Sequence, residues 1–124
     1  EKEHMREDEL LPLVAEGKVV IPANKLHTCL NPEGIGSMLQ TKINVNLGIS
    51  RDCKDYDIEM KKVMEAVNLG AHAIMDLSSH GNTEPFRKKL IAECPVMVGT
   101  VPIYDSVIHY QRDLATLTAK VWIS

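Results

Sequence analysis

The chain alternates apolar and polar residues through Lys42-Ile43-Asn44-Val45-Asn46-Leu47-Gly48-Ile49-Ser50. Three apolar side chains fall on one side of an extended chain, and a lysine and two asparagines fall on the other, which is the period of a β-strand. Gly48 and Ser50 interrupt the pattern, so we predict a strand over residues 41–47. Asparagine is uncommon in strands. Asn46 stands at the C-terminal end of this one, where α/β barrels place their active sites.

Two further strand patterns follow at equal intervals. Residues 73–77 include Met75, and the stretch 98–104 ends in Tyr104. The interval of 29 residues between Asn46 and Met75 recurs between Met75 and Tyr104. Helical patterns separate the strands, so the repeat predicts βα units with parallel strands. Both an open doubly wound sheet and a closed barrel fit this pattern.

The other elements follow from the same periodicities. Met60, Val63, Met64 and Val67 form an apolar stripe on the clearest helix, and we expect it and the next helix to cover one face of the sheet. We predict helices over residues 5–16, 55–69, 83–93, 105 or 106 to 110, and 119–124, strands over 18–22, 41–47, 73–77 and 96–101, and a loop-rich segment over 23–40.

Composition narrows the function classes. The chain has 124 residues, of which 44% are hydrophobic, and a formal net charge of −3, so it lacks the basic footprint of a nucleic-acid-binding domain. No apolar run approaches the ~20 residues that span a bilayer. The N-terminal residues lack a signal-peptide core, and we predict a cytoplasmic protein. Cys29, Cys53 and Cys94 have no metal-binding spacing, which indicates reduced thiols.

Asn46, Met75 and Tyr104 are the candidate site residues. At or near the C-terminal ends of parallel strands, they would bring an amide, a thioether and a phenol to one mouth. Such groups bind and orient a small polar ring by hydrogen bonds and soft contact, but none is a general base at neutral pH. The alternative is that Met75 fills the core and Tyr104 is a half-buried aromatic residue.

Other polar residues carry weaker signals. His72 and His80 flank opposite ends of strand 73–77, which argues against a shared zinc ion. Asp76 faces away from Met75 and either anchors a neighbouring loop or carries function. His27 follows Pro22-Ala23-Asn24 and fits a loop histidine without a special role. The segments Gly34-Ile35-Gly36 and 78–82 are only weakly compatible with phosphate binding.

Five ordered blocks together resemble a known family. They are Val20-Ile21-Pro22-Ala23-Asn24 with His27, Gly34-Ile35-Gly36, Lys42-Ile43-Asn44-Val45-Asn46-Leu47-Gly48, Met75-Asp76-Leu77-Ser78 and Val98-Gly99-Thr100-Val101-Pro102-Ile103-Tyr104. This order resembles the first part of the phosphomethylpyrimidine synthase family, the thiamine pyrimidine synthases. The related 5-hydroxybenzimidazole synthase of anaerobic cobamide synthesis has a similar core and is an alternative that the sequence does not separate from it. The resemblance runs from about residue 17 to residue 117.

The resemblance implies a radical S-adenosylmethionine lyase that rearranges 5-aminoimidazole ribotide to hydroxymethylpyrimidine phosphate. It also implies a [4Fe–4S] cluster, a metal such as zinc, and a homodimer. Asn46, Met75 and Tyr104 fall on family positions that contact the substrate. The implied fold is a partial (β/α)8 TIM barrel, with residues 1–40 as a lead-in and residues 41–124 as the first three to four βα units.

The chain also departs from the family pattern. It has no counterpart of the C-terminal cysteine motif that holds the cluster or of the metal-binding histidines, so we expect the 124-residue chain alone to bind neither group and to be inactive. Three or four strands cannot close a barrel. We therefore expect the open surface to be covered by the rest of the barrel or by another copy. The rival reading is a non-catalytic truncated or split subunit that binds a nucleotide-like ligand or completes a partner's barrel.

Overall fold

The computed structural model describes residues 2–123 as a mixed α/β structure with two small sheets. In chain order the elements are α1 (Glu7–Ala15), β1 (Val19–Val20), β2 (Ile35–Gly36), β3 (Asn44–Leu47), α2 (Tyr56–Asn68), β4 (Ala73–Asp76), α3 (Glu84–Glu93), β5 (Met97–Thr100), α4 (Pro102–Tyr110), a 3-10 turn (Leu114–Thr116) and α5 (Ala119–Ile123). These residues form no closed barrel. The last position of the predicted helix 119–124 lies outside the described residues.

The larger sheet has the order β3-β4-β5, and both neighbouring pairs are parallel. This confirms the predicted pairing of the three strands. Asn46 is the register partner of Met75, and Met75 is the register partner of Gly99. The predicted alternation holds within β3, because Val45 and Leu47 are half-buried while Asn44 and Asn46 are exposed. The strand begins at Asn44 rather than at residue 41, and Ile43, predicted on the apolar side, is 58% exposed.

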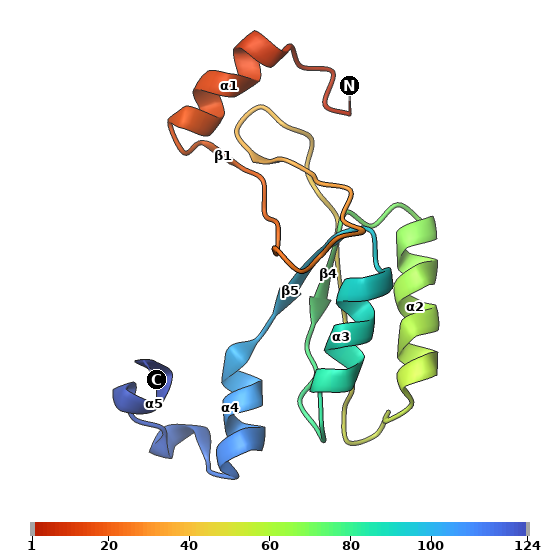
Figure 1. Ribbon diagram of the computed structural model, residues 1–124, viewed down its shortest axis with the longest axis vertical. Helices are drawn as coiled ribbons and strands as arrows, with labels where there is room; N and C mark the ends of the chain where they lie inside the picture. The colour runs from red at the N-terminus through yellow and green to blue at the C-terminus, as the bar shows by residue number, and fades with distance from the viewer. Residues whose placement is uncertain (1, 124) are drawn as a thin grey trace.

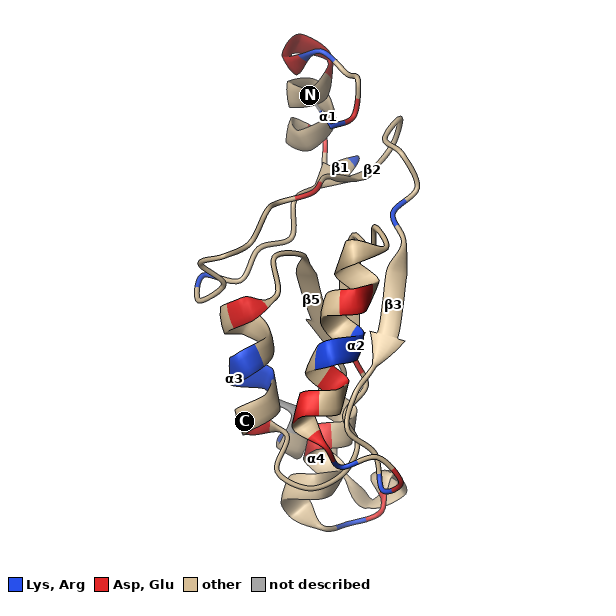
Figure 2. Ribbon diagram, turned by 90° about the vertical axis from the view of Figure 1, so that its right-hand side faces the viewer, with Lys and Arg blue, Asp and Glu red and all other residues tan. Residues whose placement is uncertain are grey.

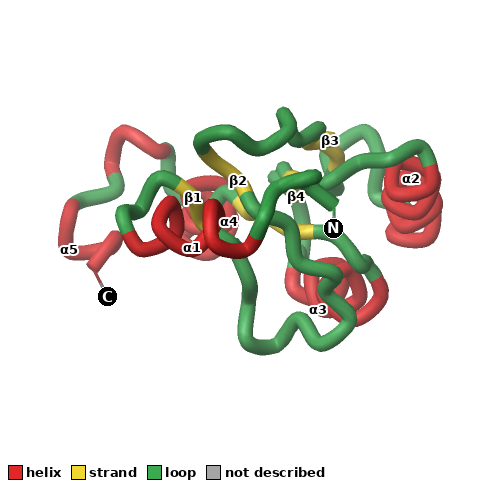
Figure 3. The backbone as a smooth tube through the Cα atoms, turned by 90° about the horizontal axis from the view of Figure 1, so that it is seen from above, coloured by secondary structure: helices red, strands yellow, loops and turns green. Residues whose placement is uncertain are grey.

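Helices α2 and α3 cover one face of this sheet (Figures 1 and 3). The core between them contains Val63, Ile74, Phe86 and Leu90, each fully buried. Figure 2 shows charged residues along α2 and α3, and all of them are exposed or partly exposed except Glu59 of α2, which is buried. The predicted apolar stripe is confirmed at Met60 and Val63, whereas Met64 is 38% exposed at the margin of the contact.

Helix α2 begins and ends as its sequence predicts. The Asp55 side chain caps the helix by accepting hydrogen bonds from the backbone N–H groups of Asp57 and Ile58. At the other end Gly70 adopts φ +93°, and the N–H groups of Gly70 and Ala71 bond to the carbonyls of Val67 and Ala66. This is a Schellman motif, which turns the chain toward β4.

The N-terminal part with α1, β1 and β2 lies beyond the N-terminal ends of the strands of the larger sheet (Figures 1 and 2). Strands β1 and β2 pair antiparallel, so Ile35 and Gly36 form a short strand where the sequence predicted only loop. Figure 3 shows this pair on the side of the sheet away from α2, and Figure 1 shows α1 projecting beyond it. A shielded ion pair between Glu3 and Lys42 fixes the start of the chain to the segment before β3.

The end of the third strand differs from the prediction. Strand β5 stops at Thr100, and helix α4 begins at Pro102 rather than at residue 105 or 106. Proline lacks an N–H group and has a φ angle suited to a helix, so it is favoured in the first turn. Within residues 2–123, no helix is both long and apolar enough to cross a bilayer.

Candidate functional site

Asn46 and Met75 lie side by side on the face of the sheet that α2 and α3 leave open. They are register partners in neighbouring parallel strands, so their side chains leave the sheet on the same face. The Asn44 side chain donates a hydrogen bond of 3.0 Å to the Asn46 side-chain oxygen. The amide of Asn46 therefore keeps its own N–H donors available at an exposed position.

Gly99 makes room for Met75. A Cβ atom at position 99 would lie 2.9 Å from Met75 Cε and 3.0 Å from Met75 Sδ, so the thioether rests directly on the glycine backbone. Beside them is an apolar groove of about 620 Å³ between the open face and the N-terminal segment, lined by Pro22, Ile35, Leu39, Lys42, Asn44, Ala73, Met75, Met97 and Gly99 among others.

Tyr104 occupies a different kind of position from the one predicted. It lies in the first turn of α4, four residues beyond the end of β5, and is 40% exposed. The structure thus brings Asn46 and Met75 into one row, whereas Tyr104 reaches the C-terminal edge of the sheet on a helix. Figure 1 shows α4 following β5 at that edge.

The loops that follow β3 and β4 are joined to each other by hydrogen bonds. Ser78 donates to the carboxylate of Asp76 through its N–H at 2.9 Å and its hydroxyl at 2.5 Å, and the Ser78 hydroxyl accepts from the N–H of Ile49. Gly48, at φ +144°, passes so close that a Cβ atom would lie 2.5 Å from Ser78 N. Asp76 therefore anchors neighbouring loops, one of the two alternatives that the sequence left open.

An arginine connects Asp76 with α4. Arg87 Nε donates to Asp76 Oδ2 at 3.1 Å, and its Nη1 and Nη2 atoms donate to Asp105 at 2.8 and 3.3 Å. Burial lowers the pKa of Arg87, but the bonds and charges of Asp105 and Asp76 outweigh burial and raise it overall. Sequence reasoning missed this network, because nothing local to Arg87 or Asp105 indicates that the two residues meet.

Glu59, in the first turn of α2, is a second buried carboxylate, and nothing in the sequence around it indicates its burial. It is 1% exposed and accepts hydrogen bonds from Gly48 N–H, the Cys53 thiol and Lys62. Burial raises the pKa of Glu59, but the bonds from Lys62, Cys53 and Gly48 outweigh that effect and bring it below its ordinary value of 4.5. Glu59 thus ties the loop after β3 to α2.

This shift predicts a pH dependence of stability. Because the folded pKa of Glu59 is lowered, its contribution is present above pH 4.5 and is lost as the pH falls through the folded pKa. We expect Glu59→Gln to reduce the free energy of unfolding at about pH 7 and to reduce it much less at about pH 3.5. Urea unfolding at both values measures this, with Glu65→Gln on the exposed surface of α2 as the control. An equal loss at both pH values would contradict the prediction.

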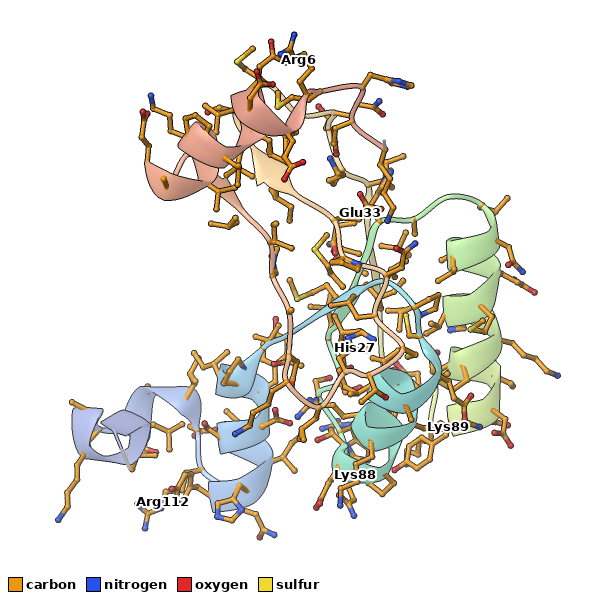
Figure 4. The ribbon with its side chains drawn as sticks, turned by 45° about the horizontal axis from the view of Figure 1, so that its top comes forward. Arg6, His27, Glu33, Lys88, Lys89 and Arg112 are labelled. Atoms are coloured by element: carbon orange, nitrogen blue, oxygen red, sulfur yellow. The ribbon has the colours of Figure 1, made fainter. Side chains whose placement is uncertain are left out.

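The histidines and cysteines form no joint site. The Nε2 atom of His27 lies 2.5 Å from the carbonyl oxygen of Cys94, so this buried residue secures the loop before β2 to the end of α3 (Figure 4). His72 Nδ1 accepts from the N–H of Ile43. Cys29 also bonds to the Cys94 carbonyl, whereas Cys53 bonds to Glu59. Across residues 2–123, no group of three or more His, Cys, Asp or Glu residues is arranged to hold a metal ion.

Comparison with known proteins gives one consistent result. The model of a family described as "Radical SAM ThiC family" matches residues 1–124. The phosphomethylpyrimidine synthase of Clostridium acetobutylicum is 58% identical over 123 residues, which cover 99% of this chain and 28% of that protein. The phosphomethylpyrimidine synthase of Clostridium botulinum strain Hall is 54% identical over 122 residues, with coverages of 98% and 28%. The chain thus spans little more than a quarter of the length of these relatives.

Proposed function

Because the chain belongs to the radical SAM ThiC family, we propose that it forms the N-terminal part of a phosphomethylpyrimidine synthase. The observation that carries this proposal is 58% identity across nearly the whole chain to a synthase of that name. In the complete protein, meaning this chain together with the rest of its barrel, the reaction would be the rearrangement of 5-aminoimidazole ribotide in thiamine biosynthesis. The complete protein would act as a cytoplasmic homodimer.

In this proposal the three-stranded sheet is the first part of a (β/α)8 barrel. The open face that carries Asn46 and Met75 would become the barrel interior, and the edge that carries α4 would become its active-site mouth. Strand β5 would pair with the next strand of the barrel. The parallel order β3-β4-β5 with helices on a single face supports this arrangement.

The described residues would supply one wall of the substrate site. Asn46 would bind and orient a polar ring by hydrogen bonds, Tyr104 would add its hydroxyl, and Met75 would pack against the ring. These groups position a substrate and do not transfer protons at neutral pH, so the chemistry falls to the cofactor.

The cysteines of this chain do not fit an iron–sulfur cluster. Cys94 is fully buried, and burial raises its pKa, which favours the thiol over the thiolate that a cluster needs. Cys53 donates its hydrogen to Glu59, and the same bond raises its pKa. We therefore propose that the [4Fe–4S] cluster, S-adenosylmethionine and a metal such as zinc are bound by other parts of the complete protein.

The test compares the complete protein with the 124-residue chain after anaerobic iron–sulfur reconstitution. We expect the complete protein to convert 5-aminoimidazole ribotide to hydroxymethylpyrimidine phosphate and to release 5′-deoxyadenosine. The chain alone should release no 5′-deoxyadenosine above a no-protein control. A benzimidazole product, identified by mass spectrometry, would overturn the thiamine assignment, and release of 5′-deoxyadenosine by the chain alone would contradict our placement of the cluster.

A further inference from the structure

One side chain, Asp105, makes the side-chain hydrogen bonds that attach helix α4 to the rest of the fold. No residue of α4 is buried. Within residues 2–123, the side-chain hydrogen bonds that join α4 to another element all end on Asp105, which accepts from Thr83 at 2.9 Å and from two nitrogens of Arg87. The position of α4 therefore depends on a side chain next to Tyr104 in the sequence.

Arg87, which bonds to Asp105 through its Nη atoms, is also held by a second carboxylate, that of Asp76. Its Nε atom bonds to Asp76, a fully buried residue at the end of β4, which is also held by Ser78. Asp76 directly follows Met75, so the same strand end carries a candidate substrate contact on one face and the anchor of Arg87 on the other. A guanidinium group suits this arrangement because it is planar and can bond to two carboxylates at once.

We propose that Arg87 and Asp105 are positioning residues that place Tyr104 relative to Asn46 and Met75, a role that rests on the proposed function. Asp76, Arg87 and Asp105 form a clamp from the end of β4 to α4. Without it α4 loses the hydrogen bonds of Asp105 to Thr83 and Arg87 and keeps only half-buried side chains such as Val107 and Ile108 against the described residues, so Tyr104 can shift with the helix. A displacement of about 1 Å at a substrate contact can reduce a rate about 10²-fold.

The main variant is Asp105→Ala in the complete protein. Asp105 is 30% exposed, and Arg87 keeps its bond to Asp76 when Asp105 is removed, so we expect the fold to stay intact. Removal of Arg87 would instead leave the buried Asp76 charge without its partner. The control is Lys88→Ala, next to Arg87 on α3 (Figure 4). It breaks only the exposed ion pair with Glu84.

The first measurement needs no substrate. Amide hydrogen exchange of residues 102–110 reports directly on the clamp. We expect Asp105→Ala to accelerate exchange of α4 about tenfold while α3 keeps its protection, and Lys88→Ala to change neither. Unchanged exchange of α4 in Asp105→Ala would overturn the clamp whether or not the proposed function is correct.

The second measurement is the dissociation constant for 5-aminoimidazole ribotide, by calorimetry on cluster-free complete protein. We expect Asp105→Ala and Tyr104→Phe each to weaken binding about tenfold, and the double variant to weaken it no further, because Asp105 acts through Tyr104. Independent losses that multiply to about 10²-fold would overturn the positioning role. Failure of the unmodified protein to bind the ribotide would instead refute the proposed function, and with it this role, while the exchange result on the clamp would stand.

Discussion

Replacing Gly48 with alanine is expected to lower the free energy of unfolding by more than about 3 kcal/mol, through a forbidden backbone angle and a steric clash together. Gly48 has φ +144°, a conformation that other residues rarely adopt. The new Cβ atom would lie 2.5 Å from Ser78 N, 2.9 Å from the Leu77 carbonyl carbon and 3.0 Å from Asp76 Oδ1. The first two are backbone atoms of a turn that a hydrogen bond to the Asp76 carboxylate fixes. Moving them away from the new Cβ atom would therefore cost a large amount of free energy.

The matched control is Gly70→Ala. Gly70 also has a positive φ, +93°, but nothing lies within 4 Å of the added Cβ atom. We expect a loss of about 1 kcal/mol there, from backbone conformation alone. Urea unfolding of the complete protein, followed by circular dichroism, compares the two variants. If Gly48→Ala cost no more than Gly70→Ala, the close approach of the loops after β3 and β4 would be wrong.

Asn46→Ala should reduce kcat/KM of the complete protein about 10²-fold, because a positioning contact to the substrate is lost. Stability should fall by no more than about 1 kcal/mol, since the substitution removes the side-chain hydrogen bond that Asn46 accepts from Asn44. The control Asn68→Ala removes an exposed amide from the end of α2 and should leave both quantities unchanged. Ribotide turnover and thermal unfolding measure the two effects. Full activity of Asn46→Ala would remove this residue from the substrate site.

The parts of the fold that the sequence predicted well are those with local signals. The alternation around Val45 placed β3 and its faces, and the apolar spacing of Met60 and Val63 placed α2. The end of β5 was predicted too late because the apolar run through Ile103 continues into a helix, and only Pro102 indicates the change. The strand at Ile35 and Gly36 was missed because two residues are too few to show an alternation of apolar and polar side chains. These residues form a strand only through pairing with β1, which is distant in the sequence.

The candidate site was only partly predictable for a related reason. The interval between Asn46 and Met75 places both on one face when parallel strands pair in register, and they do. The bonds of Glu59 to Gly48 and of Arg87 to Asp105 join different elements. In the sequence, such residues look like ordinary surface charges of amphipathic helices, because burial and partners are set only by tertiary packing.

The strand order has a consequence for how the sheet assembles in time. Since β3, β4 and β5 lie in the sheet in the order in which the ribosome makes them, each strand pairs with the one synthesised just before it. Helix α2 and the pairing of β3 with β4 need nothing made later in the chain, and the loop secured by His27 can dock only after α3 and Cys94 have emerged. Folding by addition at one growing edge keeps contacts local and limits the time for which an unfinished strand is exposed to other chains.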